Sequence, residues 1–488
     1  MACQRLKPLS KHPIQLGVLL ALPLATGCEQ VCVGVGCEED FGSARISLVA
    51  GADVPESGIA NPAEGTFVLT GTDALGPNWD VVVLNERILV GSSSDSSVRS
   101  YTPGGENTIA SSSATGRIDG NRTDDQFGTQ VKTIRNRDGK EDLLVSAPLV
   151  SASASTRHDG AVYRFSDLGQ GFAGQRSADD AILRMTGEWS GGRFGTSLAV
   201  CPDLDGDGLE EWMAAAPRDG KTAPLAGQVV LVQSGDLSED TNQIVVSILD
   251  TRWTGVAVGE MAGHALSCKH DLTGDGIPDL VIGAPYADQD AEVDASGAIY
   301  ILSGDKLQGS GPLPEVATIT LQPGESNDWF GWSLTTGDFD GDGTYDLAAG
   351  APGTAEATGR VRIWTGATLA SEDPTNPDIT INGLNPGDGF GRRVHAADVN
   401  GDGIDDLLVG APFVNPTGLT EAFDAGSVAL FFGSNDVVEW SLRSNALNAS
   451  VLYEEAAQYL RTGIALFSGD FDSDGLDDIV FLQRTSEE

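Results

Sequence analysis

The stretch FGWSLTTGDFDGDGTYDLAAGAP, residues 330–352, shows the unit from which most of this sequence is built. It begins with Phe-Gly, places short apolar segments on either side of an acidic loop, and ends in Ala-Pro. Short apolar runs punctuated by Gly, Asp and Pro are typical of brief β-strands joined by turns. The stretch therefore predicts two strands with the acidic loop between them.

The same unit recurs along the chain with a spacing of roughly 60 to 70 residues, a period expected for propeller blades with generous loops. The opening Phe-Gly recurs at 127–128, 194–195 and 390–391, and the closing Ala-Pro at 147–148, 216–217, 284–285 and 411–412. Two further strand-like runs follow in each copy, for example 297–302 and 317–321. Each copy is thus predicted to be one blade of four short strands.

The repeats predict an all-β fold, a β-propeller that occupies residues 41–488. We expect blades near 76–120, 125–187, 192–257, 262–324, 329–384 and 389–455, followed by a partial unit over 462–488 that has only two strands. The missing pair lies at the other end of the chain, where 42–48 match the third-strand pattern of 426–432 and 66–71 match the fourth-strand pattern of 181–187. Pairing these N- and C-terminal strands in one blade would close a seven-bladed ring of four-stranded blades without an open seam.

Five blades carry an acidic loop of the form Asp-x-Asp/Thr/Asn-x-Asp-Gly-x-x-Asp/Glu between their first two strands. Alternate positions of such a loop point inward together, Gly permits the left-handed turn, and Ca²⁺ prefers a cage of oxygen ligands. We therefore predict five Ca²⁺ sites, with side chains at positions one, three, five and nine and the backbone carbonyl of position seven as ligands. These residues are Asp203, Asp205, Asp207, Leu209 and Glu211; Asp271, Thr273, Asp275, Ile277 and Asp279; Asp338, Asp340, Asp342, Thr344 and Asp346; Asp398, Asn400, Asp402, Ile404 and Asp406; and Asp470, Asp472, Asp474, Leu476 and Asp478.

The loops are not equivalent. Thr273 and Asn400 each replace a carboxylate, so the second and fourth sites should be weaker. In the blade near 125–187, Ile134 occupies the first position and we expect little or no calcium. An EF-hand shares the opening of the motif but requires a bidentate acid at position twelve and flanking helices. The twelfth residues here are Ala214, Ile282, Ala349, Val409 and Phe481. Solvated acidic turns without metal are the remaining alternative.

The Phe-Gly and Ala-Pro marks together with the acidic loops closely resemble the FG-GAP repeats of the integrin α-subunit head, over nearly all of residues 41–488. The resemblance implies adhesion or partner binding through loops on the face opposite the calcium loops. The tripeptides at 137–139 and 218–220 read Arg-Asp-Gly and are not the adhesive Arg-Gly-Asp tripeptide.

Charge and residue types limit the possible functions. With 29 Lys and Arg against 71 Asp and Glu, the net charge of −42 would repel nucleic acid, which we therefore exclude as a partner. No Gly-x-Ser-x-Gly or His-Glu-x-x-His pattern occurs, and we expect His158, His264, His270 and His395 to pack or hydrogen-bond rather than catalyse. We expect a binding protein with an unidentified protein or glycan ligand, and not an enzyme. A purely structural envelope component and a hydrolase or lyase using the central propeller pocket are the alternatives.

The N-terminus predicts export. Residues 1–13 carry Arg5, Lys7 and Lys11 without an acid, and the apolar run 14–25 is too short to span a bilayer, as in a secretory signal peptide over 1–27. Leu24-Ala25-Thr26-Gly27-Cys28 resembles the lipobox of bacterial lipoproteins, although Leu24 lies one residue further from the cysteine than usual. The resemblance implies that Cys28 is lipidated and that 28–40 tether the protein to the outer membrane or surface of a bacterium through the lipid alone. An ordinary cleaved signal with unmodified Cys28 is the alternative.

Four other cysteines bear on the compartment. Cys32 and Cys37 could close a small disulfide in an oxidising environment or remain free thiols. Cys201 and Cys268 occupy nearly matching places in adjacent repeats, offset by one position. They could pair across the two blades, but because that offset would point them to opposite faces of regular strands, we favour buried free thiols.

Overall fold

The computed structural model describes residues 43–49, 58–60, 67–74, 80–84, 87–102, 108–110, 113–151, 157–168, 172–237, 242–288, 295–307, 309–323, 325–371, 374–415, 424–436, 440, 443–454, 461–469 and 475–484. All of them belong to the larger of two units, Asp40–Glu488, and the smaller unit is Met1–Glu39. The expected signal peptide over 1–27, the tether over 28–40, and Cys28, Cys32 and Cys37 lie outside the described residues.

The described strands form seven sheets of four or five strands, and the fold is all-β as the sequence predicts. The first sheet holds β4 (Val81–Leu84), β5 (Arg87–Ser92), β6 (Ser97–Tyr101) and β8 (Gly116–Asp119); the second holds β9 (Val131–Arg135), β10 (Glu141–Ala147), β11 (Ala161–Phe165) and β13 (Leu183–Thr186). The third holds β14 (Ser197–Cys201), β15 (Glu211–Ala216), β16 (Gln228–Val232) and β18 (Arg252–Thr254); the fourth holds β19 (Ala265–Ser267), β20 (Leu280–Ala284), β21 (Ala298–Leu302) and β23 (Ile319–Leu321).

The remaining three sheets continue this order. The fifth holds β24 (Ser333–Gly337), β25 (Asp346–Ala351), β26 (Arg360–Trp364) and β27 (Ile379–Asn382); the sixth holds β28 (Arg393–Ala397), β29 (Asp406–Ala411), β30 (Ser427–Phe431) and β31 (Val451–Glu454). The seventh combines β32 (Leu466–Gly469) and β33 (Asp478–Arg484) with β1 (Ser43–Val49) and β3 (Phe67–Ala74). Strand β1 pairs antiparallel with β33 from Ala44 opposite Arg484 to Val49 opposite Ile479. Strands from both ends of the chain therefore share one sheet.

Five sheets have an additional outer strand, which the expectation of four-stranded blades did not include. These strands are β2 (Gly58–Ala60), β7 (Thr108–Ala110), β12 (Gly174–Ser177), β17 (Gln243–Val245) and β22 (Gly311–Pro312), and each pairs parallel with the fourth strand of its sheet. Each comes from the linker between the third and fourth strands of a neighbouring sheet. A three-residue extended segment in a polar linker has no periodicity to predict it. The described helices are short: η4 (Thr123–Asp125), η5 (Ala178–Asp180), η6 (Ser234–Asp236), η7 (Val246–Ile248), η8 (Gly304–Lys306), η9 (Ala446–Asn448), α1 (Leu313–Val316), α2 (Thr354–Ala357) and α3 (Gly366–Leu369).

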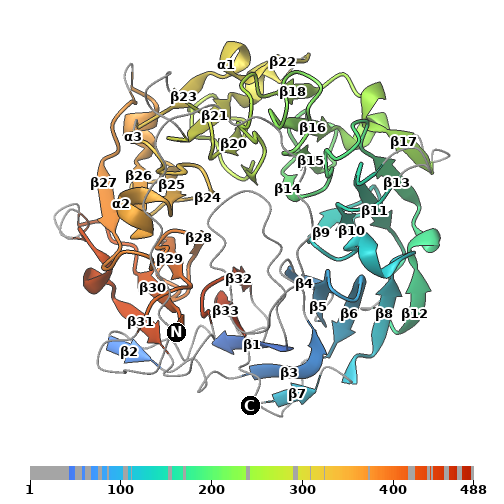
Figure 1. The fold of residues 1–488 in the computed structure, drawn as a ribbon, viewed down its shortest axis with the longest axis horizontal. Coiled ribbons are helices and arrows are strands. Elements are labelled where there is room, and N and C mark those ends of the chain that lie inside the picture. Colours follow the sequence, from blue (N-terminus) through green and yellow to red (C-terminus); the bar gives the residue numbers. More distant parts are fainter. Residues whose placement is uncertain are drawn as a thin grey trace, which may run out of the picture. The chain divides into compact units, whose positions relative to one another are not determined.

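The first strands of neighbouring sheets contact one another in cyclic order (Figure 1). The contacts join β4 to β9, β9 to β14, β14 to β19, β19 to β24, β24 to β28, β28 to β32 and β32 to β4. The apolar core lies between successive sheets: Phe127, for example, is buried with Leu84 and Leu89 of the first sheet and Leu143 and Tyr163 of the second. Phe194, Phe330 and Phe390 are likewise buried in cores shared by two neighbouring sheets.

The glycines of the repeat are required where neighbouring sheets approach closely. Gly391, which follows Phe390 at the start of one repeat, has a φ of 82°. A Cβ on Gly350, which precedes Ala351-Pro352 of the previous repeat, would collide with the Gly391 carbonyl oxygen. The start of one repeat therefore packs against the end of the second strand of the repeat before it.

The prediction that Cys201 and Cys268 are free thiols is wrong, because the two form a disulfide with a Cα–Cα distance of 5.0 Å. Cys201 is the last residue of β14, whereas Cys268 lies one residue beyond the end of β19. The alternation of a regular strand therefore does not apply to Cys268, and both sulfurs reach the core shared by the third and fourth sheets.

We expect replacement of both cysteines by alanine to lower the free energy of unfolding by up to about 4 kcal/mol, because the bridge closes a loop between residues 67 positions apart. Chemical denaturation of the wild type and the C201A/C268A variant, both without reductant, measures the difference. An unfolded wild type with two more titratable thiols than the unfolded variant, together with an unchanged midpoint, would contradict the bridge.

Candidate metal centres

The first four acidic loops lie at the same end of their sheets, since each joins a first strand to a second strand. They connect β14 to β15, β19 to β20, β24 to β25 and β28 to β29. In the first loop Gly206 and Gly208 have φ of 79° and 86°, and their N–H groups donate to the Asp203 carboxylate at 2.7 and 2.9 Å. Glycine at both places allows the chain to wrap around its first aspartate.

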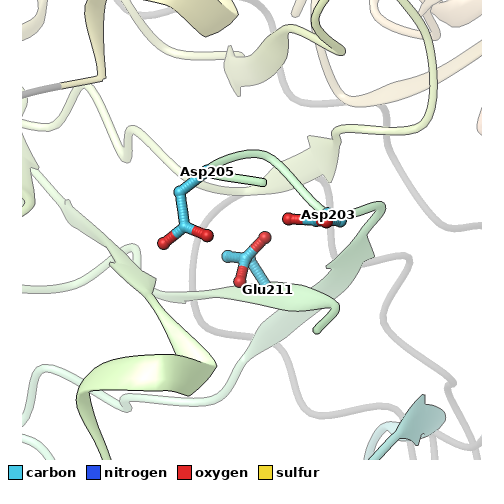
Figure 2. A group of neighbouring side chains, drawn as sticks. All are labelled: Asp203, Asp205 and Glu211. Carbon is cyan, nitrogen blue, oxygen red and sulfur yellow. The ribbon is translucent and has the colours of Figure 1, made fainter. Parts of the chain in front are cut away.

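Three carboxylates face one another in this first loop, those of Asp203, Asp205 and Glu211 (Figure 2). One oxygen from each lies within 4.8 Å of the others. The two aspartates belong to the exposed turn, whereas Glu211 begins β15 and is 0% exposed. A rigid strand and a tight turn thus present hard oxygen ligands at the spacing that suits Ca²⁺.

Glu211 gives the clearest sign that these residues fit a cation. Its Oε2 accepts from the N–H of Leu204 at 2.7 Å, but its buried Oε1 has no hydrogen-bond partner among the described residues. Burial raises the pKa of Glu211 to about 7, and repulsion from the three aspartates of the loop adds to the rise. A buried carboxylate oxygen beside like charges is costly unless a cation lies against it.

The second and third loops bring carboxylates together in the same way. The groups are Asp271, Asp275 and Asp279, and Asp338, Asp340 and Asp346, again with one oxygen per residue within 4.8 Å of the others. Burial raises the pKa of Asp279 to about 6 and that of Asp346 to about 8, and nearby aspartates add to both shifts. In the second loop the Thr273 hydroxyl donates to Asp279 at 3.2 Å, so it already contacts one of the expected ligands.

The fourth loop has the same turn but an amide at its third position. Asp398 accepts from the N–H groups of Gly401 and Gly403 at 2.7 and 2.9 Å. Asn400 donates from Nδ2 to Asp402 at 3.0 Å, a contact that a carboxylate at this position could not make. Burial raises the pKa of Asp406 to about 7, and repulsion from nearby aspartates adds to the rise.

In the fifth loop, Asp470, Asp472 and Asp474 lie outside the described residues. Leu476 and Asp478 are placed, and Asp478 begins β33 with a buried side chain. Asp478, at position nine, therefore begins the second strand of its sheet with a buried side chain, as Glu211 does in the first loop.

Some expected ligands take part in the turn itself. The position-five residues Asp207, Asp275, Asp342 and Asp402 each accept, at Oδ1, from the N–H of the position-seven residue at 2.8, 2.8, 2.7 and 2.9 Å. Within the described residues, the three-carboxylate groups of the first and third loops leave out Asp207 and Asp342. The carbonyls of Leu209, Ile277, Thr344, Ile404 and Leu476 stay predictions as ligands.

The blade near 125–187 has a basic side chain at the matching place. Asp142 occupies position nine, and its Oδ2 accepts from Nε of Arg164 at 2.8 Å, while its Oδ1 accepts from Asn136 at 2.8 Å. Arg164 comes from the third strand of the same sheet, β11. Among the described residues, no comparable ion pair joins a basic side chain to the expected ligands of the first four acidic loops. The Asp142–Arg164 ion pair supports the expectation of little or no calcium there.

Sequence reasoning missed a glycine that follows the third strand of the fourth, fifth and sixth sheets. Gly304, Gly366 and Gly433 donate their N–H groups to Asp279, Asp346 and Asp406 at 2.9, 2.9 and 2.7 Å. A Cβ on Gly304 would collide with Ile277 at position seven of the loop. The sequence does contain a signal for this contact, because in these three sheets a glycine stands two residues after the end of the third strand.

The half-buried histidines His270 and His395 lie within hydrogen-bond distance of hydroxyl groups. His270 Nδ1 lies 2.9 Å from Thr336 Oγ1 and its ring stacks on Tyr345, and His395 Nε2 lies 2.9 Å from Ser468 Oγ. Burial lowers the pKa of His270 and of His395 to about 4, so both are neutral at pH 7.

The metal-free protein should lose stability as pH rises from 7.5 to 8.5. In this window folded His270 and His395 are neutral, and so are nearly all unfolded histidines, whose pKa is about 6.5. Glu211, Asp346 and Asp406 have folded pKa values of about 7 to 8, above their unfolded values of about 4. The folded state therefore binds more protons and its stability falls as they dissociate. Melting temperatures of metal-depleted protein across this pH range measure the fall in stability, and Asp346→Asn should make that fall smaller. A melting temperature that rises with pH would contradict the burial of these carboxylates.

Comparison with known proteins agrees with the repeat unit. The FG-GAP repeat model matches residues 271–302, 330–364 and 390–431. Integrin alpha-5 of Xenopus laevis is 30% identical over 197 residues, 40% of this chain and 18% of that protein. Phosphatidylinositol-glycan-specific phospholipase D of Homo sapiens is 34% identical over 223 residues, 43% of this chain and 25% of that protein. The solved structure of the Dos1 propeller matches with a TM-score of 0.44 and 10% identity over 91% of this chain and 94% of that chain.

The chain spans a quarter or less of the length of these two curated relatives. Within the part of the chain that the structure describes, no helix has the length and apolar character needed to span a membrane. Three segments of the chain thus match FG-GAP repeats, and part of its sequence is similar to integrin alpha.

Proposed function

We propose that this protein is a calcium-binding propeller of the cell envelope that binds a protein or glycan ligand, in adhesion or a related contact, and is not an enzyme. The observation that carries the proposal is the convergence of three carboxylates in each of three acidic loops, with the buried Oε1 of Glu211 left without a partner among the described residues. The spacing of the motif extends the proposal to five loops.

The ions would have a structural role. Ca²⁺ held by the predicted ligands would supply the positive charge that offsets repulsion within each loop. Asp203 and Asp205 lie on the turn and Glu211 on β15, so the residues that would hold the ion tie the turn to the second strand. The opposite ends of the sheets then form a rigid support for ligand-binding loops.

We infer further that the seven sheets are the blades of one closed ring. The cyclic contacts among the first strands and the pairing of β1 with β33 support this inference. Closure through both termini leaves no exposed strand edge between the first blade and the last.

Two alternatives predict different results. A structural envelope component would retain no specific ligand, and a hydrolase or lyase would turn over glycans or lipids. The similarity to phospholipase D does not favour the second alternative, because the match covers 25% of that protein. His270 and His395 are neutral and half-buried, and each already lies within hydrogen-bond distance of a hydroxyl group, so they are poorly placed to exchange protons with a substrate.

The test is capture of defined ligands by the purified full-length protein. We expect glycans on an array, or proteins of a bacterial envelope extract, to be retained with Ca²⁺ and released by chelator, and no turnover of glycan or lipid substrates. If no glycan or protein is retained with or without Ca²⁺, the structural alternative is favoured. Calcium-dependent turnover of a glycan or lipid would show that the protein is an enzyme.

We also propose that the protein is anchored through a lipid on Cys28. The tether over 28–40 would hold the propeller within at most ~40 Å of the membrane when extended. Metabolic labelling with a fatty acid should mark the wild type and not Cys28→Ala. Label on the variant, or none on the wild type, would show that the anchor assignment is wrong.

A further inference from the structure

The third and fourth acidic loops, which belong to the fifth and sixth sheets, are joined by reciprocal hydrogen bonds. The backbone N–H of Asp338 donates to Oδ2 of Asp405 at 2.9 Å, and the N–H of Asp405 donates to the Asp338 carbonyl at 2.9 Å. Asp338 is the expected first ligand of the third loop. Asp405 lies between Ile404 and Asp406, two expected ligands of the fourth loop. The two bonds therefore connect segments that would hold two different ions.

A second connection between these loops runs through the segment that follows β30. Gly433 donates its N–H to Oδ1 of Asp406 at 2.7 Å, and the N–H of the next residue, Ser434, donates to the Phe339 carbonyl at 3.1 Å. The Trp440 indole N–H donates to the same carbonyl at 2.7 Å. Phe339 holds position two of the third loop, so the sheet that carries the fourth loop also fixes the backbone of the third.

Close packing accompanies these bonds. Gly341 holds position four of the third loop, and a Cβ there would lie 2.9 Å from Cδ1 of Ile404. Gly206 and Gly274 hold position four of the first and second loops, and no described atom lies within 4 Å of a Cβ on either. Position eight of the second loop is Pro278, which has no N–H to donate toward the first loop. At these positions the first and second loops therefore lack the contacts that join the third and fourth.

The contacts with the other neighbouring loops are of different kinds. Asp477, at position eight of the fifth loop, donates its N–H to the Asp398 carbonyl of the fourth loop at 3.4 Å. His270, which precedes the second loop and is not an expected ligand, stacks its ring on Tyr345 of the third loop, with the ring centroids 3.8 Å apart. Among the described residues, the third and fourth loops are therefore the most directly connected pair.

We propose that the third and fourth loops bind calcium cooperatively, and that Asp405 is the positioning residue that couples them. An ion held by the Ile404 carbonyl and the Asp406 carboxylate would fix Asp405 between them. Asp405 in turn holds the backbone of Asp338, so the third loop would be pre-organised before its own ion binds and would lose less free energy on ordering. The coupling rests on the proposed calcium binding and adds how two of its sites depend on each other.

The coupling is reciprocal, because an ion that raises the affinity of the other loop by some factor has its own affinity raised by the same factor. Repulsion between two divalent ions opposes it. The Asp405 carboxylate places a negative charge where the two loops meet, which offsets part of that repulsion. We expect each ion to raise the calcium affinity of the other loop at least about fivefold.

Two alanine variants at position three test the coupling. Asp340 and Asp205 hold this position in the third and first loops, and each belongs to a convergent group of three carboxylates. Competition between the full-length protein and a chromophoric chelator measures the calcium affinity of each successive site. Asp340→Ala should weaken its own site and, by at least about fivefold, one further site or more. Asp205→Ala should weaken its own site alone, and the proposal is wrong if Asp340→Ala does the same.

The role of Asp405 is tested by repeating the Asp340→Ala measurement in altered proteins. Asp405→Ala removes the acceptor for the Asp338 N–H, whereas Asp405→Asn keeps an acceptor oxygen there. The effect on a further site should largely disappear with Asp405→Ala and persist with Asp405→Asn. The matched control is Glu210→Ala, which removes the position-eight acceptor of the Arg135 N–H, a 2.7 Å bond toward the blade expected to bind little or no calcium. Glu210→Ala should leave the effect unchanged.

Melting curves in saturating calcium confirm that each variant is folded, and the comparison of Asp340→Ala with Asp205→Ala decides the proposal if Asp405→Ala is not. An undiminished effect of Asp340→Ala in the Asp405→Ala protein would overturn the role of Asp405. Calcium bound at independent sites would overturn the coupling and leave the proposed calcium binding standing, whereas a wild type that binds no calcium would overturn both.

Discussion

Removal of Ca²⁺ is expected to lower the melting temperature by more than about 10 °C. An ion present at about a hundred times its dissociation constant stabilises the folded state by about 2.7 kcal/mol, so five sites could supply up to about 13 kcal/mol. That sum is comparable with the whole stability of a typical domain. Without the ions, buried carboxylates such as Glu211 and Asp346 remain beside like charges. Thermal unfolding in excess chelator, followed by readdition of Ca²⁺ or Mg²⁺, measures the effect.

Ca²⁺ should restore the melting temperature and Mg²⁺ should restore it poorly, because Mg²⁺ prefers six ligands in octahedral geometry and gives up water reluctantly. Two alanine variants form a matched pair. Asp340→Ala removes a carboxylate from the convergent group of the third loop, whereas Thr273→Ala removes a hydroxyl from the second loop. Asp340→Ala should weaken calcium binding more. An unchanged melting curve in chelator, with no calcium in the purified protein, would reduce these loops to acidic turns.

The parts of this molecule that repeat were predictable from the sequence. A side chain at a fixed position of a repeated motif, such as Asp203 or Asp338, has its place set by the turn and the strand around it. The structure brings each of these two residues together with two carboxylates of its own loop. The pairing of 43–49 with the C-terminal strand was predictable for the same reason, since both match strand patterns within the repeat.

Features that depend on a single position were not predictable in this way. Arg164 neutralises Asp142 from a different strand, and nothing in the spacing of the acidic loop indicates it. The Cys201–Cys268 bridge depends on a strand that ends one residue before the second cysteine, and strand ends are poorly determined by sequence patterns. The outer strands depend on tertiary contacts, because a segment such as Gly58–Ala60 becomes a strand only by pairing with β31.

Deletion of residues 1–71 is expected to abolish cooperative folding, whereas deletion of residues 1–40 is expected to leave the melting temperature close to that of the full chain. The longer deletion removes β1 and most of β3 but none of the predicted calcium ligands. Strand β1 lies between β33 and β3 in the seventh sheet, so its loss leaves β32 and β33 as a two-stranded hairpin. It also exposes the β33 edge and removes the pairing that joins both ends of the chain. Thermal unfolding in calcium, followed by circular dichroism, compares the two truncations. A chain without residues 1–71 that melts cooperatively within a few degrees of the full-length protein would show that the terminal strands do not hold the propeller together.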